Sequence, residues 1–342
     1  MNSSELSSNV ANAILTFHYV TGFTFFVINI FVCLLIVFDK DSRGHSYRKY
    51  LISLQLSSTL MDLFGNAYAP VFLVNCRLIF SESLLSRYVD IAVYGSVEII
   101  LFGCVVTSYF ACVYYRRNIV LPPRSRFCFI GWRRNLLFIA LLTSSLTIAV
   151  GCIVATNFTR GRAIPPILIW VLGKSSYIFY YDSDWLFATA AVTVAYYLSL
   201  SILCAVMVVQ SLYELNHGLH YASVATKRYQ KRAVVSLAFQ GIVPKIMFLA
   251  PVIVLITLYL NALSMSLEEA AKNQKVSTVS SLVFSLITTH ALVHSMTIVA
   301  CSAGYRRTIR NLIRVPFRRG RLSDVNARKQ SVTIAHSTAF YK

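Results

Sequence analysis

The chain has 342 residues, of which 56% are hydrophobic and only 13% are charged. A soluble domain carries about 25% charged residues, and half that density cannot cover a globule of this size. The 13% aromatic content excludes a disordered chain. The net charge of +19 lies in short clusters between long apolar blocks, which argues against nucleic acid as a partner. The composition therefore predicts an integral membrane protein.

Seven apolar stretches are long enough to cross a bilayer, whose hydrocarbon core of about 30 Å needs about 20 apolar residues in a helix. The sequence predicts an all-α bundle whose spans are 14–38, 51–73, 89–114, 135–155, 185–212, 234–260 and 278–301. The segment 163–181 is also apolar, but Pro165, Pro166, Gly173 and Lys174 interrupt it. We therefore expect an extracellular loop there.

The loop charges predict the orientation, because Lys and Arg concentrate in short cytoplasmic loops. One side of the predicted bundle holds 24 Lys and Arg residues and the other holds seven. Residues 1–13 are thus expected outside, the transmembrane domain at 14–303, and the C-terminus in the cytoplasm. The apolar and basic faces of 304–316 predict a short amphipathic helix in the membrane interface. The polar segment 317–342 is expected to be a disordered tail.

Two features concern the predicted extracellular side. Glycosylation sequons begin at Asn2 and Asn157, and both are expected outside the membrane. Of the eight cysteines, only Cys76 and Cys152 are expected near the outer face, where a disulfide between them is possible. The cysteine spacing matches no zinc motif, and we expect neither a metal nor a cofactor.

Four ionisable residues lie near the middle of predicted spans, where charges are costly and often functional. They are Asp62, Glu98, Lys245 and His290, on the second, third, sixth and seventh helices. One interpretation is a polar layer beneath a ligand cavity, with Lys245 paired to Asp62 or Glu98. The other interpretation is that these side chains only join neighbouring helices.

Two further patterns lie in the last two predicted helices. His290 and His294 share one helix face, but no third histidine lies in a nearby span, so we do not predict a metal site. Pro244 and Pro251 are expected to kink the sixth helix. Such a kink is a candidate hinge, although packing alone also tolerates such prolines.

A basic cluster flanks the predicted inner ends of the third, fifth and sixth helices. Its members are Arg116, Arg117, Lys227, Arg228, Lys231 and Arg232. These side chains are candidates for docking an acidic partner helix, since arginine offers oriented donors to carboxylates. Their alternative role is to fix topology and contact lipid headgroups. No GxSxG, HExxH or P-loop motif is present, so we do not predict an enzyme.

The order and spacing of several short motifs resemble the nematode serpentine chemoreceptors of class H and class I. The matching residues are Phe17 to Gly22, Asn29, Tyr47 to Leu51, Gln55, Asp62, Pro70, Ser223 to Lys231, Leu237, Gln240, Pro244, His290, Tyr305 and Arg306. The chain departs from the family at Gly304, where proline is usual. The third helix ends in Tyr114-Tyr115-Arg116-Arg117, unlike the Asp-Arg-Tyr of rhodopsin-like receptors. An arginine lock of the rhodopsin type is therefore not carried over.

The resemblance implies a chemosensory G-protein-coupled receptor that detects an unidentified small molecule. It also implies a heterotrimeric G protein as partner and a place in the plasma membrane of sensory neurons, on the cilium. A multi-pass transporter or channel-like protein is the alternative. The absence of an internal repeat in the sequence argues against a transporter built from inverted halves.

Overall fold

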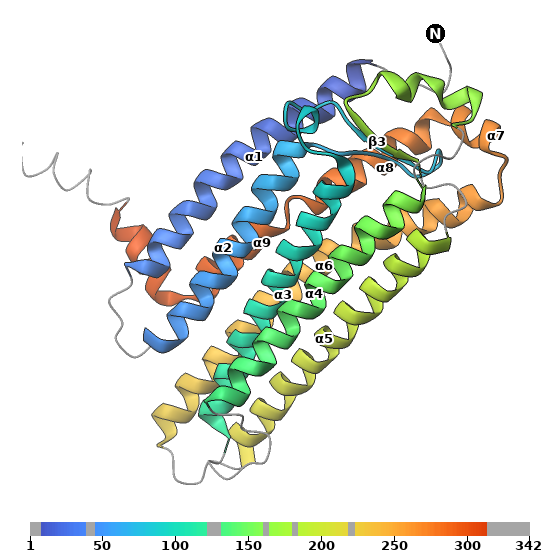
Figure 1. Ribbon diagram of the computed structural model, residues 1–342. Coiled ribbons are helices and arrows are strands. Elements are labelled where there is room, and N and C mark those ends of the chain that lie inside the picture. The colour runs from blue at the N-terminus through green and yellow to red at the C-terminus, as the bar shows by residue number, and fades with distance from the viewer. Residues whose placement is uncertain are drawn as a thin grey trace, which may run out of the picture.

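The computed structural model describes residues 8–38, 45–121, 131–159, 164–179, 184–217 and 223–312. Long helices lying side by side make up most of these residues (Figure 1). They are α1 (Ser8–Val37), α2 (His45–Tyr68), α3 (Ile91–Val120), α4 (Trp132–Thr159), α5 (Asp184–His217), α6 (Val224–Leu263), α7 (Leu267–Lys272), α8 (Gln274–Ile287) and α9 (His290–Cys301). Residues 303–312 are also helical, which covers most of the segment predicted as an amphipathic helix.

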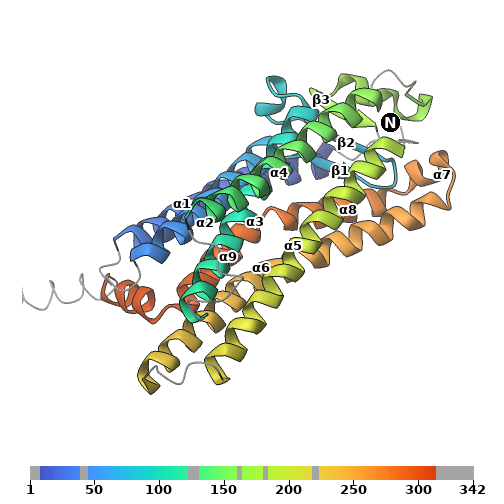
Figure 2. The same ribbon diagram turned by 60° about the horizontal axis from the view of Figure 1, so that its bottom comes forward.

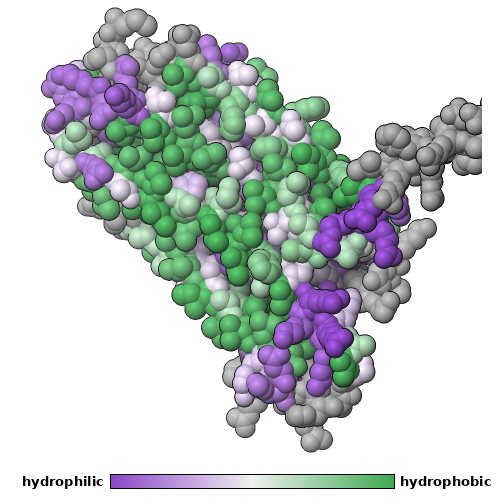
Figure 3. Space-filling model, turned by 180° about the vertical axis from the view of Figure 1, so that it is seen from behind, coloured by the Kyte–Doolittle hydropathy of each residue, from purple (hydrophilic) through white to green (hydrophobic). Residues whose placement is uncertain are grey.

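Within the described residues, six helical stretches are long and apolar enough to cross a membrane. They are α1, α3, α4, α5, α6, and α8 taken together with α9. The remaining long helix, α2, has 24 residues and more polar side chains. Its residues Gln55, Thr59, Asp62 and Asn66 are buried against neighbouring helices, so they do not face lipid. The predicted seven-helix bundle is therefore confirmed, and Figure 3 shows its apolar surface between polar ends.

A small sheet covers one end of the bundle, which we call the hairpin end. Strands β1 (Val71–Leu73) and β2 (Leu78–Ser81) form an antiparallel hairpin, and β3 (Ser176–Phe179) pairs with the other edge of β2. The opposite end, where α3 ends and α6 begins, carries the basic cluster and is called the basic end. Figures 1 and 2 show the two ends separated by the length of the long helices.

The hairpin corrects the predicted second span, which ran to residue 73. The helix ends at Tyr68, because Ala69 has φ 48° and Pro70 follows it. A positive φ interrupts a right-handed helix, and proline lacks the N–H that the next turn would need. The apolar strand β1 looks like the end of a transmembrane helix in the sequence alone.

The segment predicted as an extracellular loop packs over this hairpin rather than crossing the bundle. A 3-10 helix at Pro166–Gly173 buries Leu168 and Val171 beside β1 and β2. Lys174 Nζ lies 2.5 Å from Glu82 Oε1, and it also lies over the ring of Trp170. The prediction that this segment is not an eighth span is confirmed.

At the basic end, the fifth and sixth helices extend beyond their predicted limits. α5 continues to His217 and α6 begins at Val224, so much of the predicted 213–233 loop is helical. The side chain of Ser223 caps α6 by accepting a hydrogen bond from the backbone N–H of Thr226 at 3.2 Å. Hydropathy finds only the apolar part of a helix, and the polar turns beyond it went undetected.

The centre of the bundle is α3, which contacts α2, α4, α5 and α6. Its buried aromatic side chains include Tyr109, Phe110 and Tyr114. α6 approaches α3 closely at Gly241, where an added Cβ would lie 1.9 Å from Tyr109 Oη. Tyr109 Oη donates to the carbonyl of Leu237 at 3.3 Å, so this contact joins α3 to α6.

Candidate functional site

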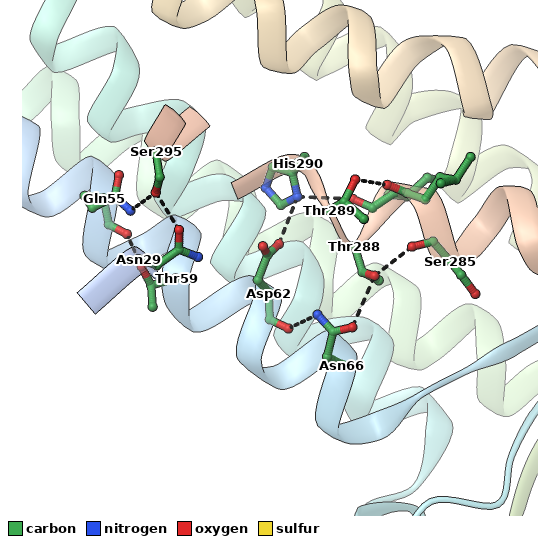
Figure 4. A network of polar contacts seen from close by, with 12 residues as sticks. Asn29, Gln55, Thr59, Asp62, Asn66, Ser285, Thr288, Thr289, His290 and Ser295 are labelled. Carbon is green, nitrogen blue, oxygen red and sulfur yellow. Dashed lines mark hydrogen bonds and ion pairs between the residues drawn. The ribbon is translucent and has the colours of Figure 1, made fainter. Parts of the chain in front are cut away.

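The predicted seventh span is broken near its middle, which separates α8 from α9. α8 ends at Ile287 and α9 begins at His290, with Thr288 and Thr289 in the turn between them. The Thr288 hydroxyl donates to the carbonyl of Ser285 at 2.8 Å, which satisfies a backbone group next to the break. The break places the His290 ring at the start of a helix inside the bundle (Figure 4).

His290 and Asp62, two of the four predicted polar-layer residues, form a buried ion pair. His290 Nδ1 lies 3.1 Å from Asp62 Oδ1 and 3.2 Å from the carbonyl oxygen of Ile287. Both neighbours accept hydrogen bonds, so Nδ1 carries the hydrogen. The two side chains are only 8% and 4% exposed, so water does not screen the pair. It joins α9 to α2.

Asn66, one helical turn from Asp62, joins three further groups. Its Nδ2 donates to the backbone carbonyl of Asp62 at 2.8 Å. Its Oδ1 accepts from His18 Nδ1 at 3.0 Å and from the Thr288 hydroxyl at 3.3 Å. The second ring nitrogen of His18 lies 3.1 Å from Ser285 Oγ. Asn66 therefore ties α2 to α1 and to the turn between α8 and α9.

A second group of hydrogen-bonded polar side chains lies toward the basic end. Gln55 Nε2 donates to Ser295 Oγ at 2.6 Å, and Ser295 Oγ donates to Asn29 Oδ1 at 2.5 Å. Gln55 Oε1 also lies 3.3 Å from His294 Nδ1. His294 thus contacts Gln55 rather than acting with His290. The described part of the chain contains no group of three His, Cys, Asp or Glu side chains placed to hold a metal.

Glu98, the third predicted polar-layer residue, lies on α3 close to α2. A Cβ added at Gly65 would lie 3.1 Å from Glu98 Oε1, so the missing side chain makes room for the carboxylate. This oxygen is buried and has no hydrogen-bond partner among the described residues. Glu98 and Asp62 interact electrostatically, so the structure brings these two predicted residues together near His290.

Lys245, the fourth predicted residue, is not part of that group. Its Nζ lies 5.1 Å from the centre of the Tyr109 ring on α3. It also lies near Cys204 on α5, and no described carboxylate forms an ion pair with it. The predicted pairing of Lys245 with Asp62 or Glu98 is therefore wrong. The orientation of α6 about its own axis places Lys245 toward α3 and α5, and hydropathy does not predict that orientation.

Arg117 and Arg116 differ from the exposed docking residues that the sequence predicts. Arg117 is buried, and its Nε donates to Gln210 Oε1 on α5 at 3.0 Å. The Arg116 guanidinium lies 4.0 Å from the centre of the Tyr47 ring on α2. Both side chains therefore hold neighbouring helices to the end of α3.

The other four members of the basic cluster lie on the first turns of α6. Arg228, Lys231 and Arg232 are exposed, and Lys227 is half-buried. Lys231 Nζ donates to Asn216 Oδ1 near the end of α5 at 3.3 Å. Beside them, the apolar side chains of Val120, Leu215 and Val234 pack together between α3, α5 and α6.

Pro244 and Pro251 both lie inside α6. Each lacks a backbone N–H, so the carbonyls of Gln240 and Met247 lose their helical partners. Helical structure continues on both sides of these positions, and the hinge role stays a prediction.

The predicted sequons and disulfide of the outer side have separate outcomes. Asn157 lies in the last turn of α4, so this helix continues past residue 155, where the predicted fourth span ended. Asn2 lies outside the described residues, as does the tail 317–342. Cys76 and Cys152 are both free thiols, so the disulfide considered between them is not formed. Burial raises the pKa of the Cys76 thiol to about 12.

Several residues of this network were not selected as candidates from the sequence, among them His18, Asn66, Ser285, Thr288 and Ser295. One signal was present in the seventh span. Residues 277, 281, 285 and 288 are Ser or Thr and recur every three or four positions, which gives that helix a polar face. Such a face inside a transmembrane helix indicates contact with another polar helix rather than with lipid.

The arrangement of long helices is that of a seven-transmembrane receptor. Among the solved structures that match is a crystal structure of squid rhodopsin, at 15% identity and a TM-score of 0.54. The match covers 86% of this chain and 80% of the rhodopsin chain. At this identity the similarity establishes the fold alone. No match was found among curated protein sequences.

The sequence pattern establishes the family. The serpentine-type seven-transmembrane G-protein-coupled receptor chemoreceptor family Srh matches residues 10–315, so the chain belongs to this family. The match is to class H, which the sequence motifs alone did not separate from class I. The chain is thus a multi-pass membrane protein, and its family and fold are those of receptors rather than enzymes.

Proposed function

We propose that the chain is a chemosensory receptor that binds a small molecule and activates a heterotrimeric G protein. The observation that carries this proposal is the packing at the basic end. There, α6 is held to α3 and α5 by the small apolar cluster of Val120, Leu215 and Val234, and by the Lys231–Asn216 hydrogen bond. Exposed Arg228 and Arg232 lie next to this cluster. If the start of α6 moves away from α3 and α5, the apolar cluster becomes exposed beside the basic side chains, and both can then contact a partner.

Such a surface fits a helix with an apolar face and acidic groups, which is the chemistry expected of a G-protein segment. Arg116 and Arg117 act differently in this proposal, because they hold α3 to α2 and α5. The docking role therefore rests on the first turns of α6 rather than on the end of α3.

The charge distribution supports placing the basic end in the cytoplasm and the hairpin end outside. In this orientation the small molecule is detected in the half of the bundle toward the sheet. Membership in a chemoreceptor family supports the plasma membrane of a sensory neuron, on its cilium, as the site of action.

The test is to express the full chain in cells and measure G-protein dissociation while small molecules are applied. Replacing Arg228 and Arg232 together by Ala should abolish most of the ligand-evoked signal and leave surface expression unchanged. Lys275→Ala is the matched control, because it removes an exposed charge at the hairpin end. Loss of surface expression in proportion to signal would show that the arginines only set topology.

A multi-pass transporter or channel-like protein is the second candidate. Uptake of the same compounds is therefore measured in parallel. Compound-dependent uptake without G-protein dissociation would overturn the receptor proposal.

A further inference from the structure

Lys245 combines two properties that are rarely found together in a transmembrane helix. Its side chain is exposed, yet its ammonium lies 5.1 Å from the ring of Tyr109, which is buried on the central helix α3. A lysine that faced lipid would point away from α3. The ammonium therefore lies beside α3, and the side chain stays accessible there.

An ammonium in the middle of a membrane is costly unless it reaches water or a counter-ion. The neighbouring groups do not supply a negative charge. Tyr109 offers the face of its ring, and Cys204 is a free thiol buried on α5. Of the two predicted partners, Asp62 is paired with His290, and the Glu98 carboxylate lies beside Gly65 of α2. No described carboxylate forms an ion pair with Lys245, so its counter-charge comes from outside the helices.

We propose that Lys245 binds the anionic group of the ligand, and that the ligand is a small organic acid with an apolar body. This inference rests on the proposed receptor function and names its ligand class. Toward the hairpin end, about two helical turns from Tyr109 and Cys204, aromatic side chains lie on both α3 and α5. Phe102 of α3 and Tyr197 of α5 meet there with ring centres 4.6 Å apart. A carboxylate at the ammonium would thus place an apolar body against aromatic side chains.

The position of Lys245 also connects the ligand to α6. The residue directly follows Pro244, where the helix has lost a backbone hydrogen bond. Gly241, one turn away, and Leu237, two turns away, form the close contact with Tyr109 that holds α6 to α3. An anion drawn to Lys245 acts beside this contact, and the exposed arginines lie at the far end of the same helix.

The experiment compares matched sets of small molecules that differ only in charge. The probes are hexanoate, octanoate and 3-phenylpropanoate, with the primary amide and the primary amine of the same carbon skeletons. Two readouts are recorded: thermal stabilisation of the purified full chain, which reports binding, and G-protein dissociation in cells. At least one acid should act at a concentration about tenfold or more below that of its amide.

The variants test Lys245 directly. Lys245→Met should weaken the response to the acid by about 30-fold, because a hydrogen bond to a charged group is lost, and should leave the amide response unchanged. Lys245→Arg should retain the acid preference. Lys245→Glu should reverse the preference toward the amine, which keeps the test decisive if the Met variant does not reach the surface. Lys275→Met is the matched control.

Equal responses to acids and amides, or activity of amines or neutral compounds alone, would overturn the assignment of Lys245 while leaving receptor function intact. Acid-dependent stabilisation without G-protein dissociation would support Lys245 but contradict the receptor function. If no acid in the panel acts on either readout, the proposed ligand class is wrong.

Discussion

The two sides of the bundle are held together by different kinds of contact. On one side, α1, α2, α8 and α9 share a chain of buried hydrogen bonds that runs from His18 through Asn66 to the Asp62–His290 pair. On the other side, α6 packs along α8 and α9, and it also meets α3 and α5 through Tyr109, Gly241 and the apolar cluster at the basic end. In Figure 2, α6 lies apart from α1 and α2.

We call the hydrogen-bonded helices α1, α2, α8 and α9 the frame. The start of α6, at the basic end, is the part that we expect to move. Buried hydrogen bonds are directional, and breaking one leaves unsatisfied groups in a medium without water. Apolar contacts are not directional, and a helix can slide or tilt over them at lower cost. We therefore expect substitutions in the frame to reduce stability, and substitutions around α6 to change signalling as well.

The largest effect is expected for Asp62→Ala. Removing one partner of the Asp62–His290 pair leaves the other buried without a counter-charge, which costs about 3–5 kcal/mol in soluble proteins. The thermal midpoint of the purified chain should fall sharply, together with surface expression. The matched control is Glu268→Ala, because the Glu268–Lys272 pair is exposed and should contribute nothing measurable. A normal thermal midpoint for Asp62→Ala would contradict the hypothesis that these buried contacts stabilise the bundle.

The next effect concerns the closest contact between α3 and α6. Gly241→Ala introduces a Cβ that would clash with Tyr109 Oη at 1.9 Å, so the two helices must separate at a cost of about 1–3 kcal/mol. Basal G-protein dissociation should change, and Tyr109→Leu in the same chain should partly reverse the change. Gly95→Ala is the control on α3, where nothing lies within 4 Å of an added Cβ. Unchanged basal signalling would show that this contact does not govern α6.

A smaller effect is expected for the Arg117–Gln210 hydrogen bond, which joins α3 to α5. Arg117→Ala should lower stability by about 1.5–3 kcal/mol, the usual contribution of a hydrogen bond to a charged group. A double-mutant cycle with Gln210→Ala measures the coupling between the two side chains. If the two losses simply add, the bond contributes no coupling energy and Arg117 acts elsewhere.

The smallest effect concerns the free thiol at the hairpin end. Burial raises the pKa of Cys76 to about 12, so the thiol is protonated at pH 7 and is a poor nucleophile. A water-soluble maleimide should leave it unmodified in the folded chain and react after denaturation. Leu84→Cys provides an exposed thiol as the positive control. Rapid labelling of Cys76 at pH 7 would show that the sheet opens readily.

Hydropathy was sufficient to predict the helical spans and the loop at 163–181. It was not sufficient for the sheet, because the short apolar strand β1 has the composition of a helix end. Of the four predicted polar-layer residues, the structure brings Asp62, Glu98 and His290 together and leaves Lys245 apart. Their partners were not predicted correctly, since a pairing depends on how each helix is rotated about its axis. Lys245 faces α3 and α5, while Asp62 faces α9.

The same limit applies to the basic cluster. A run of positive charges after an apolar stretch looks exposed in the sequence. Arg117 is nevertheless buried, because α5 supplies the amide oxygen of Gln210 as its partner. Gln210 lies within the predicted fifth span, but hydropathy does not reveal that its side chain turns toward α3.

The polar character of α2 bears on how the chain enters the membrane during synthesis. An aspartate near the centre of a helix disfavours insertion by about 2.5–3.5 kcal/mol, and α2 also carries Asn66. Its retention in the bilayer therefore depends on α1, which arrives first and offers His18 to Asn66. Gly22 permits this approach, since a Cβ there would lie 2.6 Å from Asn66 Cβ. Bulky residues at position 22 are thus expected to act at the translocon, as failures of biogenesis, before any ligand is met.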